Sequence, residues 1–420
     1  MLSIYVNKFI FSKSKLINFS IFLIFILPIS ITTGPFIPDF IISLIGLIGL
    51  ILYLKKTIKV VFYKEIIFLW LFYIYLIISS INSEDIIYSL DYSLFYFRFI
   101  IFAHFVIYLV ARFPAVTKLL LYGIIISLIL ISISSIYQII NLYYFDIEID
   151  GVRRLELPFI DEEVVGSFII RTLPILIYTL VINFNELKKF NLKILLFPFI
   201  LILILIIIFS GERAALLLLL IFTILIFFTF FKLNKKISIL LFTFFLIFLS
   251  FFIYKNDQIK KRVFQDFERN ISSDFKTNPY FSYAFVSLKM FQDGPLLGLG
   301  PKMFRVYCDN YINKIDGGYC NLHPHNTYFQ LISETGLIGF LFILTAYIYV
   351  ILLFLKEIFS KNTNLYILFS SIPVIINFFP FVPSGNFFDN WLNSLYYISV
   401  ILLIYSLNTK SKLNINEFIR

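Results

Sequence analysis

Residues 323–339 read HPHNTYFQLISETGLIG, and a long apolar run follows them directly. The stretch begins in the longest polar segment of the chain and leads into a hydrophobic helix. Two of the three histidines of the protein, His323 and His325, lie at its start. Such a concentration of titratable groups, next to an apolar helix in an apolar chain, predicts a polar site at a membrane surface.

The composition outside this stretch predicts a membrane protein. Hydrophobic residues make up 60% of the 420 positions and charged residues 14%, whereas soluble domains average roughly 45–50% apolar and about 25% charged. Continuous apolar runs recur at the length that crosses a bilayer as a helix, about 20 residues. Many of these runs are rich in Ile and Phe, but membrane strands are shorter and alternate, so helices are expected. Twelve spans are predicted: 17–33, 37–54, 65–81, 95–111, 119–140, 164–184, 193–209, 214–231, 236–254, 334–355, 364–381 and 389–407.

The predicted fold is therefore an all-α polytopic membrane protein with about twelve transmembrane helices and one large periplasmic loop containing short helices. We expect nine helices within 1–254, the loop at 255–325, and three helices with a cytoplasmic tail within 326–420. The first span has the form of a signal peptide after three lysines, but no small-residue cleavage site follows it, which favours an uncleaved helix.

The net charge of +10 is explained by topology. If both termini are cytoplasmic, twenty lysines and arginines lie on the cytoplasmic side, and the short outer loops hold only Arg153, Arg154 and Arg213. Positive residues gather on the cytoplasmic side of membrane proteins, and long loops are translocated largely regardless of charge. The basic excess is thus a topology signal, and no nucleic-acid partner is expected. Cys308 and Cys320 lie in the long loop, where an oxidising compartment would allow a disulfide, with two unpaired thiols as the alternative.

Four arginines in or near the predicted spans are candidates for binding an anion. Arg98 lies early in the fourth span and either binds an anion or reaches the outer surface. Arg171 lies two turns into the sixth span, and its partner is either a substrate phosphate or Glu162 or Glu163. Arg213 follows a tight outer turn and begins a helix, where free backbone N–H groups also favour anions; the alternative is a solvated turn. Arg154 belongs to a mixed-charge outer loop.

The histidine stretch supplies a candidate base. Asn326 suits the N-cap of the tenth helix, and Gly336 and Gly339 give that helix a small face for packing. Pro324 enforces an extended step, so the side chains of His323 and His325 are expected to diverge. A metal bound by the two histidines, with Glu334 or the acidic loop as a third ligand, is the alternative, but the spacing matches no helical zinc pattern. We expect no metal and no cofactor.

The arrangement of His325-Asn326, nine residues, and Gly336-Leu337-Ile338-Gly339 resembles the signature of the O-antigen ligase and O-antigen polymerase family. The segment Pro295–Phe304 and the turn Ser210–Leu216 are also similar to that family. The resemblance covers roughly residues 150–340. It implies that His325 is the base, that Arg213 binds a diphosphate, and that Arg171 or Arg154 supplies a further ligand, with His323, Asn326, Glu334 and the two glycines in support.

By this resemblance the protein is a glycosyltransferase of the bacterial inner membrane with its active site on the periplasmic face. It would move a glycan from an undecaprenyl-diphosphate carrier to a hydroxyl acceptor such as lipid A core, without a metal. A polymerase that joins lipid-linked repeats remains an alternative. A transporter or flippase of lipid-linked sugars is a second, but its charges would lie near the bilayer midplane, whereas most outward charges here lie at the surface.

Overall fold

The computed structural model describes residues 12, 14–59, 62–144, 155–159, 162–183, 192–255, 260, 278–312 and 319–409. These residues form helices and no strand. The helices are α2 Lys15–Ser30, η1 Ile31–Thr33, α3 Phe36–Leu54, α4 Lys64–Ile81, α5 Ile86–Ser93, η2 Leu94–Tyr96, α6 Phe97–Arg112, α7 Ala115–Tyr144, α8 Val165–Ile182, α10 Leu192–Phe209, α11 Arg213–Leu233, α12 Lys235–Lys255, α15 Pro279–Asp293, α16 Phe304–Ile312, α17 Thr327–Phe359, α18 Leu365–Asn377 and α19 Asn390–Asn408.

The all-α membrane fold predicted from the sequence is confirmed. Ten helical stretches in the described part of the chain are long and apolar enough to cross a membrane. Two shorter apolar helices, Leu196–Phe209 and Leu365–Asn377, stand where the seventh and eleventh spans were predicted. The fourth span begins earlier than expected, because α5 and η2 run on into α6 as one stretch, Ile86–Arg112.

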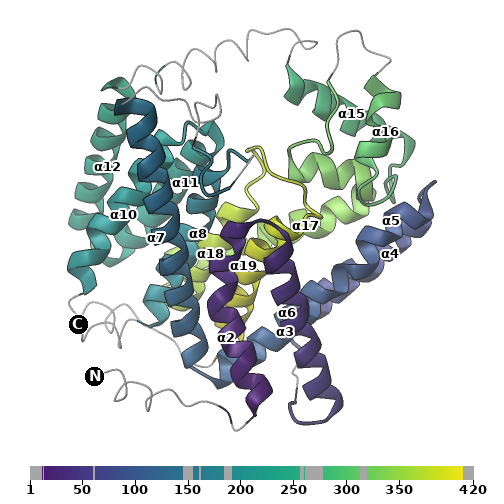
Figure 1. Ribbon diagram of the computed structural model, residues 1–420, viewed down its shortest axis with the longest axis horizontal. Helices are drawn as coiled ribbons and strands as arrows, with labels where there is room; N and C mark the ends of the chain where they lie inside the picture. The colour runs from purple at the N-terminus through teal and green to yellow at the C-terminus, as the bar shows by residue number, and fades with distance from the viewer. Residues whose placement is uncertain are drawn as a thin grey trace.

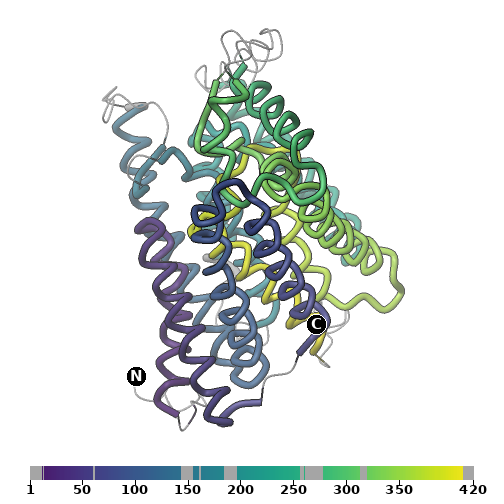
Figure 2. The backbone as a smooth tube through the Cα atoms, turned by 90° about the vertical axis from the view of Figure 1, so that its right-hand side faces the viewer, coloured from purple at the N-terminus to yellow at the C-terminus, as the bar shows by residue number. Residues whose placement is uncertain are grey.

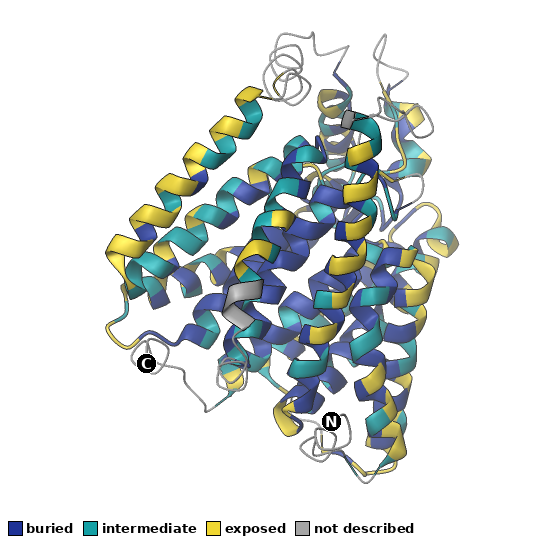
Figure 3. Ribbon diagram, turned by 60° about the vertical axis from the view of Figure 1, so that its left-hand side comes forward, coloured by how far each residue is buried: buried dark blue, intermediate teal, exposed yellow. Residues whose placement is uncertain are grey.

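The helices form a bundle whose centre is α8, α18 and α19 (Figure 1). Most of α8 is buried, 78% of its span, whereas α12 at the edge is only 11% buried. Figure 3 shows the same gradient, with exposed residues along the outer helices and buried residues in the middle. A helix that is apolar on all sides can face lipid, so the exposed apolar surface of α12 is expected in a membrane.

The prediction of the eleventh span, 364–381, was too long. α18 ends at Asn377 after 13 residues, a rise of roughly 20 Å, which is less than the roughly 30 Å of a hydrocarbon core. Residues 378–389 continue as an irregular segment that leads into α19. Irregular backbone at membrane depth is tolerated where protein buries it or where it lines a cavity, and this segment does line one.

The described part of the polar segment before α17, residues 278–312 and 319–326, forms a small cap. α15 and α16 pack against each other and over the start of α17, an arrangement visible in both Figure 1 and Figure 2. The cap has its own core, which consists of Tyr283, Val286, Met290, Phe304, Cys308 and Ile312. The sulfurs of Cys308 and Cys320 are bonded at 2.07 Å beside this core. The cap therefore holds the chain that enters α17 in a fixed position.

Candidate active site

One large cavity, about 2120 Å³, lies between the cap and the bundle. Four of the residues predicted to bind the diphosphate, to supply the base or to support it line this cavity: Arg171, Arg213, His323 and His325. They come from α8, from the start of α11 and from the loop before α17, which are far apart in the chain. Arg154, the further candidate for binding a diphosphate, lies outside the described residues.

The two histidines lie side by side, so the expectation that they diverge was wrong. Their ring centroids are 4.2 Å apart. The reason is the backbone of His325, which adopts φ 51° and turns the chain immediately after the extended step at Pro324. A non-glycine residue in this left-handed region is uncommon and typical of a constrained site. Both imidazoles therefore face the same cavity.

The surroundings of the rings favour their neutral forms. Burial, reinforced by the neighbouring His325, lowers the pKa of His323 to about 4. Burial also lowers the pKa of His325. The Nε2 atom of His325 lies 2.9 Å from Nδ2 of Asn321, and its ring centroid is 5.5 Å from that of Tyr283 in the cap. An imidazole that is neutral near pH 7 can accept a proton, as a general base requires.

The loop that carries the histidines is fixed at its exit. Asn326 caps α17, since its side-chain oxygen accepts hydrogen bonds from the backbone N–H groups of Tyr328 and Phe329. The Asn326 amide also donates to the Pro380 carbonyl at 2.8 Å. Ser384, in the irregular segment after α18, donates its N–H to the His325 carbonyl at 2.9 Å. The predicted N-cap thus also ties the histidine loop to the segment between α18 and α19.

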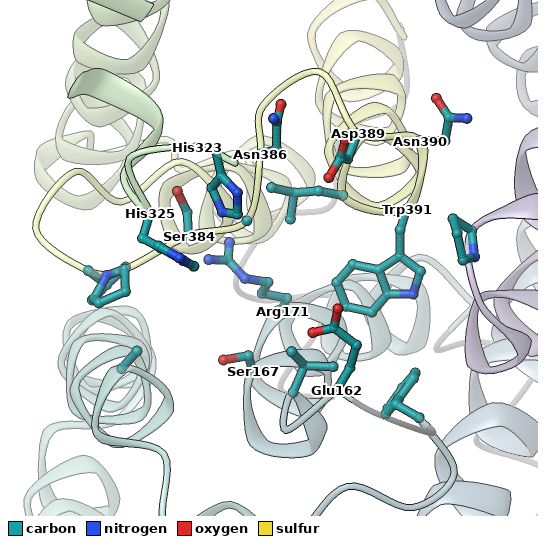
Figure 4. Close-up of a pocket in the computed structure, with 18 of the residues that line it drawn as sticks. Glu162, Ser167, Arg171, His323, His325, Ser384, Asn386, Asp389, Asn390 and Trp391 are labelled. Atoms are coloured by element: carbon teal, nitrogen blue, oxygen red, sulfur yellow. The ribbon is translucent and has the colours of Figure 1, made fainter. Parts of the chain in front are cut away.

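Arg171 is 4% exposed and donates to the Asn377 carbonyl at the end of α18, at 2.7 Å. Figure 4 shows its guanidinium pointing toward His323 and His325. The sequence offered Glu162 or Glu163 as its structural partners, but the bond found in the structure is to a backbone carbonyl. A guanidinium has five N–H donors, so the Asn377 carbonyl occupies only part of its capacity.

Arg213 begins α11 and is placed by its neighbour Glu212. The Glu212 carboxylate accepts hydrogen bonds from the backbone N–H groups of Gly166 and Ser167, at 2.5 and 3.1 Å. It thereby satisfies free donors at the start of α8, a favourable position for an anion. Glu212 therefore joins the start of α11 to the start of α8. The elements that carry Arg213 and Arg171 are thus held together.

The other half of the histidine stretch, residues 330–339, holds α17 against the Pro295–Phe304 segment, and we call this contact the brace. α17 is interrupted at Gly336, which has φ 63° and ψ −168°. The N–H of Leu337 then donates to the Pro295 carbonyl at 2.9 Å, and the N–H of Gly300 donates to the Glu334 carbonyl at 2.8 Å. A Cβ on Gly336 would lie 2.4 Å from the Leu296 carbonyl oxygen. Backbone groups freed by the break are therefore paired with the Pro295–Phe304 segment.

Glu334 takes part in the same brace. It is fully buried, and its carboxylate accepts hydrogen bonds from the backbone N–H groups of Lys302 and Phe304, both at 3.0 Å, and from the Gln330 amide at 2.9 Å. Glu334 does not line the cavity that holds the histidines, so it is not placed as the third ligand of a metal; the acidic loop was the other candidate for that ligand. Gly339 packs closely against Tyr75, as the small-face prediction implied.

The family model of the O-antigen ligases matches residues 198–344. This segment belongs to the O-antigen ligase family. It contains the Arg213 turn, the cap, both histidines and the glycine break of α17. No curated protein matches the chain.

Lys302 and Asp389 also line the cavity, although neither was singled out from the sequence. They form an ion pair, and the Lys302 ammonium also lies 4.8 Å from the centre of the Tyr92 ring. Lys302 stands in the segment Pro295–Phe304 that carried the resemblance, and a lone charge among its glycines and leucines was the available signal. Asp389 gave no local signal, because only the fold brings the start of α19 beside the histidines.

Arg98 is held within the protein, and it lines the same cavity. Its Nε donates to Asp39 and its Nη2 to Asn390, at 2.8 and 2.7 Å. The sequence left open whether this arginine binds an anion or reaches the outer surface. The structure pairs it with a carboxylate on α3.

Proposed function

We propose that this protein transfers a glycan from a lipid diphosphate carrier, of the undecaprenyl type, to a hydroxyl group of an acceptor. The observation that carries the proposal is the convergence of two arginines and two histidines, from three separate parts of the chain, on one cavity. An O-antigen ligase or polymerase type of function agrees with the family of residues 198–344. The closer proposal is a ligase whose acceptor is lipid A core.

In this mechanism His325 accepts the proton of the acceptor hydroxyl. The oxygen attacks the anomeric carbon of the donor sugar, and the bond from that carbon to the diphosphate oxygen breaks. The lipid diphosphate leaves with the electron pair, so negative charge grows on its oxygens. Arg213 and Arg171 stabilise this charge, because guanidinium groups pair closely with phosphate oxygens and Arg171 is already desolvated. Attack opposite the leaving group inverts the anomeric centre.

The proposed topology places this cavity at the outer face of the inner membrane. Both termini would be cytoplasmic, and residues 255–325 would form a periplasmic segment between the helices of 1–254 and those of 326–420. The donor would reach the cavity within the outer leaflet. Reporter fusions after Lys189, Lys236 and Lys412 should report cytoplasm, and one near Asn270 should report periplasm. A cytoplasmic signal near Asn270 would contradict the proposal, since the donor glycan is outside.

The test of function is a deletion strain whose surface polysaccharide and lipid-linked glycans are both analysed. A ligase predicts loss of surface polymer while long lipid-linked chains accumulate. Core bearing a single repeat would instead identify the polymerase. Lipid-linked glycan confined to the cytoplasmic leaflet would identify a flippase and overturn transfer as the activity.

A further inference from the structure

The start of α19 carries two polar side chains that are held toward the cavity by cations from other elements. Asp389 is paired with Lys302, and Asn390 accepts from Arg98. Trp391 follows them and lines the same cavity. Figure 4 shows Asp389, Asn390 and Trp391 on the opposite side of the site from His325. We call Asp389, Asn390, Trp391, Lys302, Arg98 and Asp39 the α19 wall.

The placement of Asp389 is unusual for its position. It is the N-cap residue of α19, but its side chain makes no capping hydrogen bond. An aspartate at an N-cap normally accepts from the first free N–H groups of its helix. Here the carboxylate is bound to Lys302 and remains 49% exposed, while the Lys302 side chain is only 5% exposed. The cation is therefore buried behind a carboxylate that faces the cavity.

Arg98 repeats this arrangement on the other side of Asn390. Its guanidinium binds the Asp39 carboxylate, the Phe95 carbonyl and the Asn390 amide oxygen. Asp39 also lines the cavity, as does the exposed Asp91. Each of the two cations of the α19 wall is thus matched by a carboxylate, so neither is a free positive charge, and the exposed Asp91 adds a negative charge to the same cavity lining. The cations Arg171 and Arg213 lie on other elements, α8 and α11.

We infer that the α19 wall binds the acceptor saccharide, and that the sugar bound there is neutral or carries an amine, not a phosphate or a carboxylate. The inference rests on the proposed transfer function and names the acceptor class of that site. Carboxylate and amide oxygens accept hydrogen bonds from sugar hydroxyls, and an aromatic ring such as Trp391 offers a face for the sugar C–H groups. An anionic sugar would meet like charge, which discriminates against it.

Trp391 provides a direct reporter. The protein has two tryptophans, and Trp70→Phe would leave Trp391 as the sole one. The Trp70 indole N–H has no hydrogen-bond partner among the described residues, so Phe loses no bond there. This variant, in nanodiscs free of sugar-headed detergent, is titrated with a glucose trisaccharide, its 2-amino derivative and its 6-phosphate while Trp391 emission is recorded. We expect saturable changes with the first two and at least tenfold weaker binding of the phosphate.

Asp389→Asn tests the residue that the inference makes central. Loss of a hydrogen bond to a charged group should weaken the neutral trisaccharide about tenfold or more. The same variant unmasks the Lys302 cation and should narrow or reverse the preference against the phosphorylated sugar, a change that misfolding cannot imitate. Asp293→Asn is the matched control, because Asp293 accepts from Tyr311 in the cap and does not line the cavity.

A buried, unpaired Lys302 can itself destabilise the protein. The double variant Lys302→Met, Asp389→Asn removes both charges and should still bind the neutral sugar more weakly. The inference would be overturned if the double variant bound the neutral sugar as tightly as the wild type does. It would also be overturned if the protein that retains Asp389 bound the neutral and the phosphorylated sugar equally well. Because no donor is present, the result is independent of transfer. If sugars bind as expected and His325→Ala still transfers glycan, the proposed mechanism is wrong, but the inference that the α19 wall binds a sugar remains valid.

Discussion

The two halves of residues 323–339 do different things in the folded protein. His323 and His325 line the cavity. Gln330, Glu334 and Gly336 are buried and bonded to other segments, and none of the three lines the cavity itself. One continuous sequence thus carries both the candidate chemistry and the structure that positions it.

The spacing between the halves has a physical meaning. The nine residues after Asn326 form the first, short part of α17, from the cap at Asn326 to the break at Gly336. One end of this short helix fixes the histidine loop, and the other end receives the Pro295–Phe304 segment. An insertion within it would rotate the histidines relative to the brace by about 100° per residue, since a helix has 3.6 residues per turn. The comparison therefore predicts that changes in the first half affect chemistry, and that changes in the second half affect stability.

The largest expected effect is that of His325→Ala. Loss of a general base typically costs about 10²–10⁴-fold in rate, so transfer from the lipid-linked donor should be undetectable while the protein accumulates in the membrane at its normal level. His323→Ala should keep substantial activity, because His323 is proposed only to support His325. The measurement is glycan transfer by equal amounts of purified variants.

Two results would contradict this assignment. If His325→Ala still transferred glycan and His323→Ala were inactive, the base would be His323. The comparison is meaningful because the ring centroids of the two histidines are only 4.2 Å apart. Equal loss in both variants, with inhibition of the wild type by chelators, would favour a metal site.

Gly336→Ala should act on the second half through stability. The residue has φ 63°, and its Cβ would lie 2.4 Å from the Leu296 carbonyl oxygen and 2.5 Å from the Gly298 nitrogen. Overpacking alone typically costs about 1–3 kcal/mol, and backbone strain adds to it. We expect a strongly reduced level in the membrane and a lower Tm. Gly46→Ala is the control, since its closest contact would be 3.4 Å, and it should keep a near-normal Tm.

The fold could be predicted from the sequence because the thickness of the bilayer sets the length of a spanning helix, so most spans appear as apolar runs of that length. The sequence also found the four site residues that converge on the cavity. It could not predict the turn at His325, because a left-handed residue after Pro324 is imposed by contacts with the segment 378–389. Nor could it find Asp389 or the pairing of Arg98 with Asp39, because these depend on which helices are neighbours. The break at Gly336 could not be predicted, because a pair of glycines in a membrane helix gives the same sequence pattern for a helix break and for a small packing face.

Glu334→Gln should have a smaller effect than Gly336→Ala. The two carboxylate oxygens accept from the N–H groups of Phe304 and Lys302. A glutamine side chain offers only one oxygen, so one buried N–H would lose its acceptor, at a cost of about 1–3 kcal/mol. We expect a lower Tm with residual transfer. Glu357→Gln is the matched control at the far end of α17, where one carboxylate oxygen accepts from the Asn364 N–H and a glutamine can replace it. Equal Tm values for the two variants would contradict the role of Glu334 in the brace.

The smallest expected effect is a shift in the pH dependence of transfer. A general base works in its neutral form, so the rate should fall as pH drops through the pKa of His325. Burial lowers that pKa from 6.5, and the acid limb of the rate profile should therefore lie below pH 6.5 in the wild type.

His323→Ala sharpens this test, because it removes a ring that covers His325 and admits water. The pKa of His325 should then rise toward 6.5, and the acid limb should move upward in pH while the rate at pH 7.5 changes little. Arg213→Ala serves as the comparison, since it should reduce the rate at every pH without moving the limb toward His325's ordinary pKa. If the acid limb did not move in His323→Ala, the two rings would not share an environment during transfer. Their contact would then exist only when no substrate is bound.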